Sequence, residues 1–234
     1  MKMKRTEKRY LLTGLGLLAA FGIWTGMIRW IDVQPVGPDG SAVGFAAFNA
    51  WFHRITGVHM SLYTVTDWLG LVPILICFCF GILGAVQLFR RKNLRSVDPD
   101  ILLLGVYYIL VIAAYLFFEM VPVNYRPVLI DGVLEASYPS STTLLVLSVM
   151  PTLALQAVRR STGGPARKAA AVFAWLFSAF MVIGRLVAGV HWVTDIIGSV
   201  LLSFGLFMMY RFAVSRVDRK KAETSGRERN HGIQ

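Results

Sequence analysis

Six long stretches of this 234-residue chain contain no charged residue, and each is rich in apolar side chains. They cover residues 10–28, 69–89, 101–118, 136–158, 169–184 and 196–210. The first four contain 19, 21, 18 and 23 residues, close to the roughly 20 that an α-helix needs to cross a bilayer. The last two contain 16 and 15, and they reach that length only if Arg185, His191 and Asp195 lie at their ends. Because backbone in lipid must satisfy its hydrogen bonds internally, we predict an all-α fold, a bundle of six transmembrane helices.

The distribution of basic residues predicts the orientation of this bundle in the membrane. Of the 24 lysines and arginines, 20 fall in the clusters 2–9, 90–95, 159–168 and 211–229. With six crossings all four clusters lie on one side, which the positive-inside rule assigns to the cytoplasm. We therefore expect a multi-pass protein of the cell membrane with both termini cytoplasmic. The net charge of +11 then reflects this orientation and anionic headgroups, so the expected partner is the bilayer and not nucleic acid.

Two domains of unequal size follow from composition. Residues 1–216 contain all six apolar runs and form the expected membrane domain. Residues 217–234 are polar and basic, and we predict a disordered cytoplasmic tail there.

The first outer loop, residues 30–68, contains aromatic residues at helical spacing. Phe45, Phe48 and Phe52 recur three and four apart, with Trp51 beside them. This pattern predicts a helix that lies in the membrane interface. The helix is either a lid or rim for lipid access or a plain interfacial anchor, and the anchor is favoured.

Histidines and cysteines away from the main motifs offer no metal or cofactor site. His53 and His59 have no carboxylate at ligand spacing, so we expect surface residues. Cys77 and Cys79 lie two apart inside one apolar run and point to different faces, which favours neither a disulfide nor a metal site.

The segment from Arg185 to Asp195 carries the most chemistry. His191 and Asp195 are four residues apart, so on a helix their side chains would meet and the carboxylate would orient the imidazole. Arg185 offers a planar fork suited to phosphate oxygens. Charged groups are costly beside lipid, so this set is a candidate functional site.

The second outer segment, residues 119–141, adds further phosphate-binding groups. Arg126 places a second guanidinium at the exit of the third apolar run. Pro139 followed by Ser140 and Ser141 predicts a helix start whose hydroxyls cap the helix and whose free backbone N–H groups form an anion site. Capping alone would explain an isolated motif of this kind. Here, however, the segment emerges on the same membrane face as His191.

The order of these motifs resembles the type 2 phosphatidic acid phosphatase superfamily, over residues 119–198. The motifs that carry the resemblance are Arg126-Pro127, Pro139-Ser140 and Arg185-x5-His191-x3-Asp195. The resemblance implies hydrolysis of phosphate esters, often on lipids, through a phosphohistidine and without metal or cofactor.

The resemblance also implies a role for each matched residue. His191 would be the nucleophile and Asp195 would orient it. Arg126 and Arg185 would clamp the phosphoryl oxygens, and Ser140 and the neighbouring amides, including that of Ser141, would complete the cradle.

Two positions depart from the family pattern. Glu119 stands where the family has a phosphate-binding lysine, and its carboxylate would repel phosphate unless it is protonated or paired with an arginine. Thr142 stands where the family has a histidine that protonates the leaving oxygen. Loss of such a general acid lowers the rate by about 10²–10⁴.

The missing acid matters less for one class of substrate. A phosphate that leaves from a diphosphate, with a pKa of about 6, does not need the proton that an alkoxide needs. We therefore expect hydrolysis of a lipid phosphate or diphosphate on the outer face, with a polyprenyl diphosphate as the favoured substrate and phosphatidate or phosphatidylglycerophosphate as alternatives. The competing interpretation is a catalytically impaired member that binds phosphate-bearing headgroups without turnover. Retention of Arg185, His191 and Asp195 favours the hydrolase.

Overall fold

The computed structural model describes residues 3–231, and all regular structure in that range is helical apart from three isolated β-bridges. The helices are α1 (Arg5–Trp30), α2 (Ala46–Thr56), α3 (Met60–Leu69), α4 (Leu71–Arg91), α5 (Pro99–Met120), α6 (Ser141–Arg160), α7 (Gly164–Val187) and α8 (Val193–His231), with short 3-10 turns at Pro38–Gly40 and Leu94–Ser96. Six helical segments in this part of the chain are long and apolar enough to cross a membrane. The predicted six-helix all-α fold is therefore confirmed.

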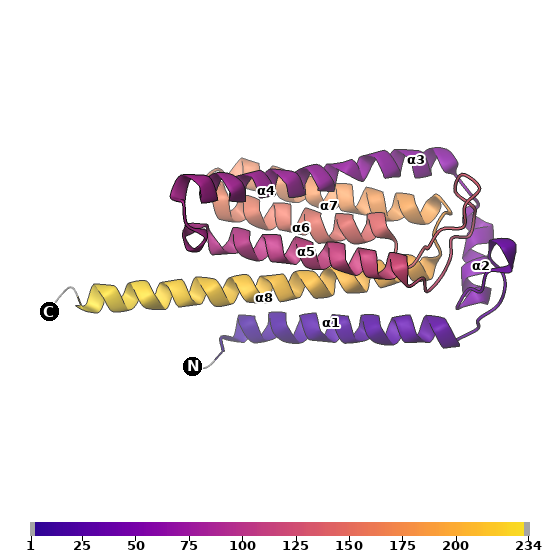
Figure 1. Ribbon diagram of the computed structural model, residues 1–234, viewed down its shortest axis with the longest axis horizontal. Helices are drawn as coiled ribbons and strands as arrows, with labels where there is room; N and C mark the ends of the chain where they lie inside the picture. Colours follow the sequence, from indigo (N-terminus) through magenta and orange to yellow (C-terminus); the bar gives the residue numbers. More distant parts are fainter. Residues whose placement is uncertain (1–2, 232–234) are drawn as a thin grey trace.

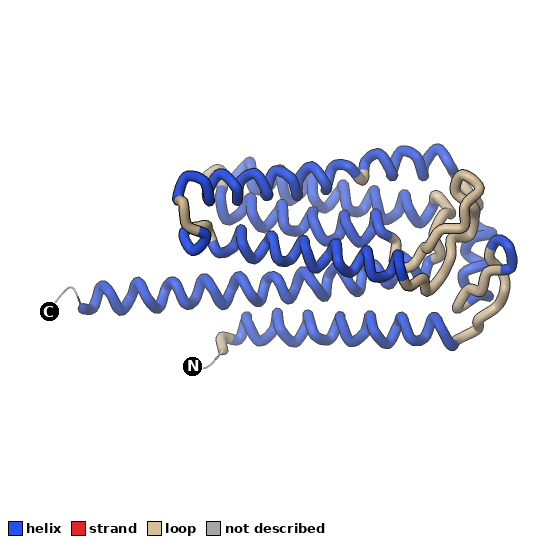
Figure 2. Tube along the Cα trace, viewed as in Figure 1, coloured by secondary structure: helices blue, strands red, loops and turns tan. Residues whose placement is uncertain are grey.

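The long helices lie side by side along one direction, and α2 lies across one end of the bundle (Figure 1). Most of the loop structure gathers at that end, as Figure 2 shows in tan. We call it the site end. The opposite end, here the terminal end, lies toward both chain termini (Figure 1).

Two helix boundaries differ from those expected. The second span runs from Met60 to Arg91 and not from residue 69, because Gly70 between α3 and α4 keeps right-handed helical angles (φ −58°, ψ −18°). The fourth span begins at Ser141, because residues 136–140 belong to the preceding loop. The N-cap of α6 is Ser140, as Pro139-Ser140 predicted, but the predicted capping by its hydroxyl is wrong, since this side chain makes no capping hydrogen bond.

The tail also differs from its prediction. Helix α8 continues to His231, whereas the sequence predicted disorder from residue 217. Contacts of Arg219 favour the helix: it lies 3.8 Å from Glu223, one turn further on, and 3.2 Å from Glu7 of α1. Residues 232–234 of the predicted tail lie outside the described part of the chain.

Ion pairs join three helices near the terminal end. Arg160 of α6 contacts Asp98 (3.1 Å) and Asp100 (2.9 Å) at the start of α5. Arg159 contacts Asp100 (3.2 Å) and Asp218 of α8 (2.8 Å). The pKa of Asp98 is lowered to about 2, chiefly by Arg91 and against the effect of burial. These charges hold α5, α6 and α8 in register at the end away from the site.

Candidate active site

The loop between α5 and α6 is a hairpin that brings Arg126 into the bundle. Tyr125 and Ala136 form an antiparallel bridge, and the Arg126 N–H donates to the Glu135 carbonyl at 3.0 Å. The turn is Asp131-Gly132, both with positive φ (50° and 78°), as a tight hairpin turn requires. The hairpin therefore sets Arg126 opposite Glu135, and Ser137 opposite Asn124.

The loop between α7 and α8, residues 188–192, lies against the link between α2 and α3. Gly189 has φ +70°, and a β-carbon there would lie 1.9 Å from the Gly57 carbonyl oxygen. The His53 Nε2 donates to the Gly189 carbonyl at 3.1 Å. The surface position predicted for His53 is therefore wrong, since it is half-buried, whereas His59 is exposed as predicted.

His191 lies in this loop with one ring nitrogen anchored and the other facing Arg126. Its Nδ1 lies 3.1 Å from the Ser137 carbonyl, which can only accept, so Nδ1 carries the proton. Its Nε2 lies 3.4 Å from NH1 of Arg126, so the lone pair is on the Arg126 side. The pKa of His191 is lowered well below 6.5, mainly by burial and then by the charges of Arg126 and Arg185. The hydrogen bond to Ser137 opposes this shift, because it raises the pKa. The imidazole is therefore neutral at physiological pH.

Asp195 does not hold His191 in the expected way. The distance from Nδ1 to the Asp195 carboxylate is 3.8 Å, too long for a hydrogen bond. The i, i+4 geometry does not apply because α8 begins at Val193, after the histidine. The carboxylate instead accepts the Trp192 backbone N–H (2.9 Å) and the Asn124 amide (3.3 Å). Asp195 thus fixes the start of α8, and a backbone carbonyl orients His191.

The two arginines have different surroundings. Arg126 forms an ion pair with Glu135 through Nε at 2.9 Å. Arg185 is 1% exposed, and NH1 lies 3.6 Å from Asp67. Its guanidinium carbon lies 4.8 Å from the ring centre of Tyr63, and that of Arg126 lies 5.9 Å from the same ring. The Nε of Arg185 is buried without a hydrogen-bond partner among the described residues, and an unsatisfied buried donor favours an incoming anion.

A cavity of about 210 Å³ lies beside His191. The charged and hydroxyl side chains that line it belong to residues of α5, the hairpin, the start of α6 and the His191 loop. These include Tyr115, Glu119, Arg126, Glu135, Ser137, Tyr138, Ser141 and His191. Phosphate-binding and nucleophilic groups therefore share one space.

Two residues expected around this space do not line it. Arg185 is absent from the lining and lies within 5 Å of Tyr63 instead. The Ser140 hydroxyl is fully buried and donates to Thr143 Oγ1 at 3.1 Å. Ser141, one residue further on, lines the cavity.

A second, larger hollow of about 570 Å³ runs between α4, α5 and α6 and is lined mainly by apolar side chains. Tyr115 and Ser141 line both the cavity and this groove. Thr142 lines the groove but not the cavity, and Glu119 lines the cavity but not the groove. The groove therefore begins where the cavity ends.

Sequence reasoning missed several residues of the site. Ser137 and Asn124 hydrogen-bond to His191 and Asp195, and no sequence motif predicts these contacts. Glu135 had a signal, because Asp131-Gly132 between short apolar runs predicts a two-residue hairpin. That hairpin would have set position 135 opposite Arg126.

Comparisons with known proteins identify the family and the fold of the chain. A family model described as the PAP2 superfamily matches residues 101–218, which include Arg126, His191 and Asp195. The fold is similar to the crystal structure of the first transmembrane PAP2-type phosphatidylglycerolphosphate phosphatase from Bacillus subtilis, with TM-score 0.57 and 19% identity over 88% of this chain and 97% of that one. A search of curated protein sequences gave no significant match. Because this family model covers more than half of the chain, the chain belongs to the PAP2 superfamily of membrane lipid phosphatases.

Proposed function

We propose that this protein hydrolyses a lipid phosphate or diphosphate through a phosphohistidine on His191. The observation that carries the proposal is the neutral imidazole, whose Nε2 faces the cavity side at 3.4 Å from Arg126. Arg126 can hold a phosphoryl oxygen, and this places phosphorus within reach of the Nε2 lone pair.

The reaction then has two displacements. Nε2 forms a bond to phosphorus as the bond to the leaving oxygen breaks, and the lipid product keeps that electron pair. A water oxygen next attacks phosphorus, Nε2 departs, and inorganic phosphate is released. The ring is positively charged in between, and the Ser137 carbonyl at Nδ1 (3.1 Å) with the Asp195 carboxylate at 3.8 Å stabilises that charge.

The adjoining apolar groove supports a lipid substrate. A headgroup in the 210 Å³ cavity can continue into a hydrocarbon chain in the 570 Å³ groove past Tyr115 and Ser141. The leaving oxygen would then lie near the boundary of the two, where Thr142 stands.

The substrate best supported is a lipid diphosphate, with a polyprenyl diphosphate as the natural candidate. Thr142 cannot protonate an alkoxide, whereas a leaving phosphate with a pKa of about 6 needs no proton. One observation favours the competing function, binding without turnover: Glu119 and Glu135 line the same cavity, and Glu135 is already paired with Arg126.

We further propose that the site end faces outward. The basic loops 90–95 and 159–168 follow α4 and α6 at the terminal end, near the N-terminus (Figure 1). The positive-inside rule assigns that end to the cytoplasm.

The test is phosphate release by purified protein in EDTA from a panel of lipid mono- and diphosphates. His191→Ala should abolish turnover and leave phosphate binding largely intact, since Arg126 still lines the cavity. The matched control is His59→Ala, because His59 is exposed and its ring bonds to the Thr56 carbonyl (2.8 Å), outside the cavity lining.

Thr142→His tests the substrate class. An imidazole at the boundary of groove and cavity should raise monoester hydrolysis far more than diphosphate hydrolysis. The diphosphate assignment fails if the wild type cleaves monoesters equally fast. The hydrolase assignment fails if no substrate distinguishes wild type from His191→Ala.

A further inference from the structure

Helix α2 presents two chemically different faces. Its inner face carries Asn49, which is 1% exposed, and the half-buried His53. Its outer face carries Phe48, Trp51 and Ile55, which are 43%, 51% and 64% exposed. Because these three positions are spaced i, i+3 and i+7, they form one apolar stripe.

The Asn49 amide binds the first turn of α8. Its Nδ2 donates to Thr194 Oγ1 (3.0 Å) and to the Gly44 carbonyl (2.8 Å). Its Oδ1 accepts the Thr194 backbone N–H at 3.4 Å. Both amide protons and the carbonyl oxygen of Asn49 are thus hydrogen-bonded. Thr194, which Asn49 holds, is the third residue after His191.

His53 reaches the same loop from its other side. Its Nε2 donates to the Gly189 carbonyl (3.1 Å), and its ring lies 5.6 Å from that of Trp192. Through Asn49 and His53, α2 therefore contacts residues both before and after His191.

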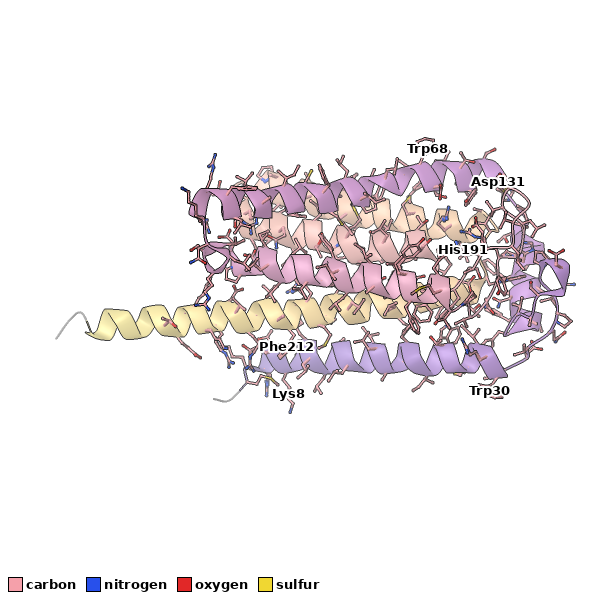
Figure 3. All side chains as sticks on the ribbon, viewed as in Figure 1. Lys8, Trp30, Trp68, Asp131, His191 and Phe212 are labelled. Carbon is pink, nitrogen blue, oxygen red and sulfur yellow. The ribbon has the colours of Figure 1, made fainter. Side chains whose placement is uncertain are left out.

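The apolar stripe fits the headgroup boundary of the surrounding bilayer. Trp30, 86% exposed, ends α1 at the same end of the bundle as His191 (Figure 3), and tryptophan is favoured at that depth. Helix α2 contains the exposed Arg54 and no acidic residue, so its charge suits anionic lipid. The six spans fix the end of the bundle near this boundary, which makes lipid the occupant of the stripe.

We propose that α2 is a membrane-anchored positioning helix. The stripe of Phe48, Trp51 and Ile55 lies in the acyl–headgroup boundary, and Asn49 transmits this fixed position to the loop that carries His191. Turnover therefore depends on contact between α2 and the bilayer. This inference rests on the proposed role of His191, but the order of the loop can be measured without any substrate.

The first experiment tests the Asn49 contact in lipid nanodiscs that contain anionic lipid. Asn49→Ala should lower kcat at least about tenfold, because displacement of a reacting group by 1 Å costs up to about 10²-fold, while KM changes less than about threefold. Hydrogen–deuterium exchange of residues 188–195 should become faster. Thr194→Val, which keeps the side-chain shape, should act in the same direction if Asn49→Ala fails to fold. Asn93→Ala, at the terminal end, is the matched control.

The second experiment tests the stripe. Trp51→Ser should speed exchange in 188–195 and lower kcat in nanodiscs, whereas Trp30→Ser should leave the loop unchanged. In detergent the difference between Trp51→Ser and wild type should shrink. Unchanged loop exchange in both Asn49→Ala and Trp51→Ser overturns the proposal, and so does an equal loss for Trp51→Ser in detergent and in nanodiscs. If wild type releases no phosphate from any lipid, the proposed function fails, while the exchange data still decide this inference.

Discussion

The replacement Gly189→Ala isolates the geometric requirement of the His191 loop. A β-carbon at this position would lie 1.9 Å from the carbonyl oxygen of Gly57, and such contacts are essentially never shorter than 3.0 Å. The two backbones must therefore separate by at least about 1.1 Å, the difference between these distances. Neither side can yield by a side-chain rotation, because the clashing atom is backbone.

The expected effect on catalysis follows from this displacement. A shift of about 1 Å at the reacting group lowers kcat by up to about 10²-fold. The positive φ of +70° adds backbone strain of about 1–3 kcal/mol for a non-glycine residue. We expect Gly189→Ala to lower both kcat for phosphate release and the thermal unfolding midpoint.

Gly132→Ala separates the effect of backbone strain from the effect of the displacement. Gly132 has φ +78°, but its position at the hairpin tip is open, and a β-carbon there would meet no atom within 4 Å. Gly132→Ala should lower the unfolding midpoint through a similar backbone strain, and it should leave kcat within about twofold of wild type. The reasoning is refuted if Gly189→Ala and Gly132→Ala have the same kcat on the same lipid.

Three further outcomes are expected. The lowered pKa of His191 keeps the imidazole neutral in the folded protein, whereas in the unfolded chain it takes up a proton near pH 6.5. The contribution of His191 to the free energy of unfolding is therefore fully present above pH 6.5. Below pH 6.5 it falls by up to about 1.4 kcal/mol per pH unit. Unfolding midpoints from pH 7.5 to 5.5 should drop more steeply for wild type than for His191→Asn, and parallel curves would contradict the neutral imidazole. Asp100→Asn should destabilise the protein by about 1–3 kcal/mol, because the Asp100 side chain is only 11% exposed and loses its ion pairs with both Arg159 and Arg160. The loss should exceed that of Asp218→Asn, whose side chain is 48% exposed, and equal losses in chemical denaturation would contradict this. In a cysteine-free background, Asp131→Cys should react with an impermeant reagent on intact cells, and reaction only after lysis would reverse the proposed orientation.

The six spans could be predicted because lipid imposes a simple rule on composition. Uncharged runs near 20 residues have few alternatives in a bilayer. The rule failed for α3, because Asp67 and the polar residues of 60–68 resemble a loop in composition. Only the structure shows that these residues join α4 in one helical span from Met60 to Arg91.

The candidate site was predictable only in part, because Arg185 and Ser140 do not line the cavity. Arg126 and His191 meet as their motifs predicted, since both emerge at one end of the bundle. The pairing of His191 with Asp195 required a helix that begins before residue 191, and α8 begins two residues later. Similarly, whether Ser140 or Ser141 faces the cavity depends on the phase of α6, which the motif does not specify.

The continuity of α3 with α4 sets the depth at which the chemistry occurs. Residues 70–89 rise about 30 Å at 1.5 Å per residue, which is the thickness of the hydrocarbon layer. Asp67 and Tyr63, which lie next to the buried arginine, then stand roughly 5 and 10 Å beyond that layer. Lipid phosphates occupy the same level, so a substrate can arrive by lateral diffusion alone. The lipid chain of the substrate stays in the hydrocarbon layer, and the charged headgroup never has to enter that layer. Moving a charged group into the hydrocarbon costs at least about 3 kcal/mol.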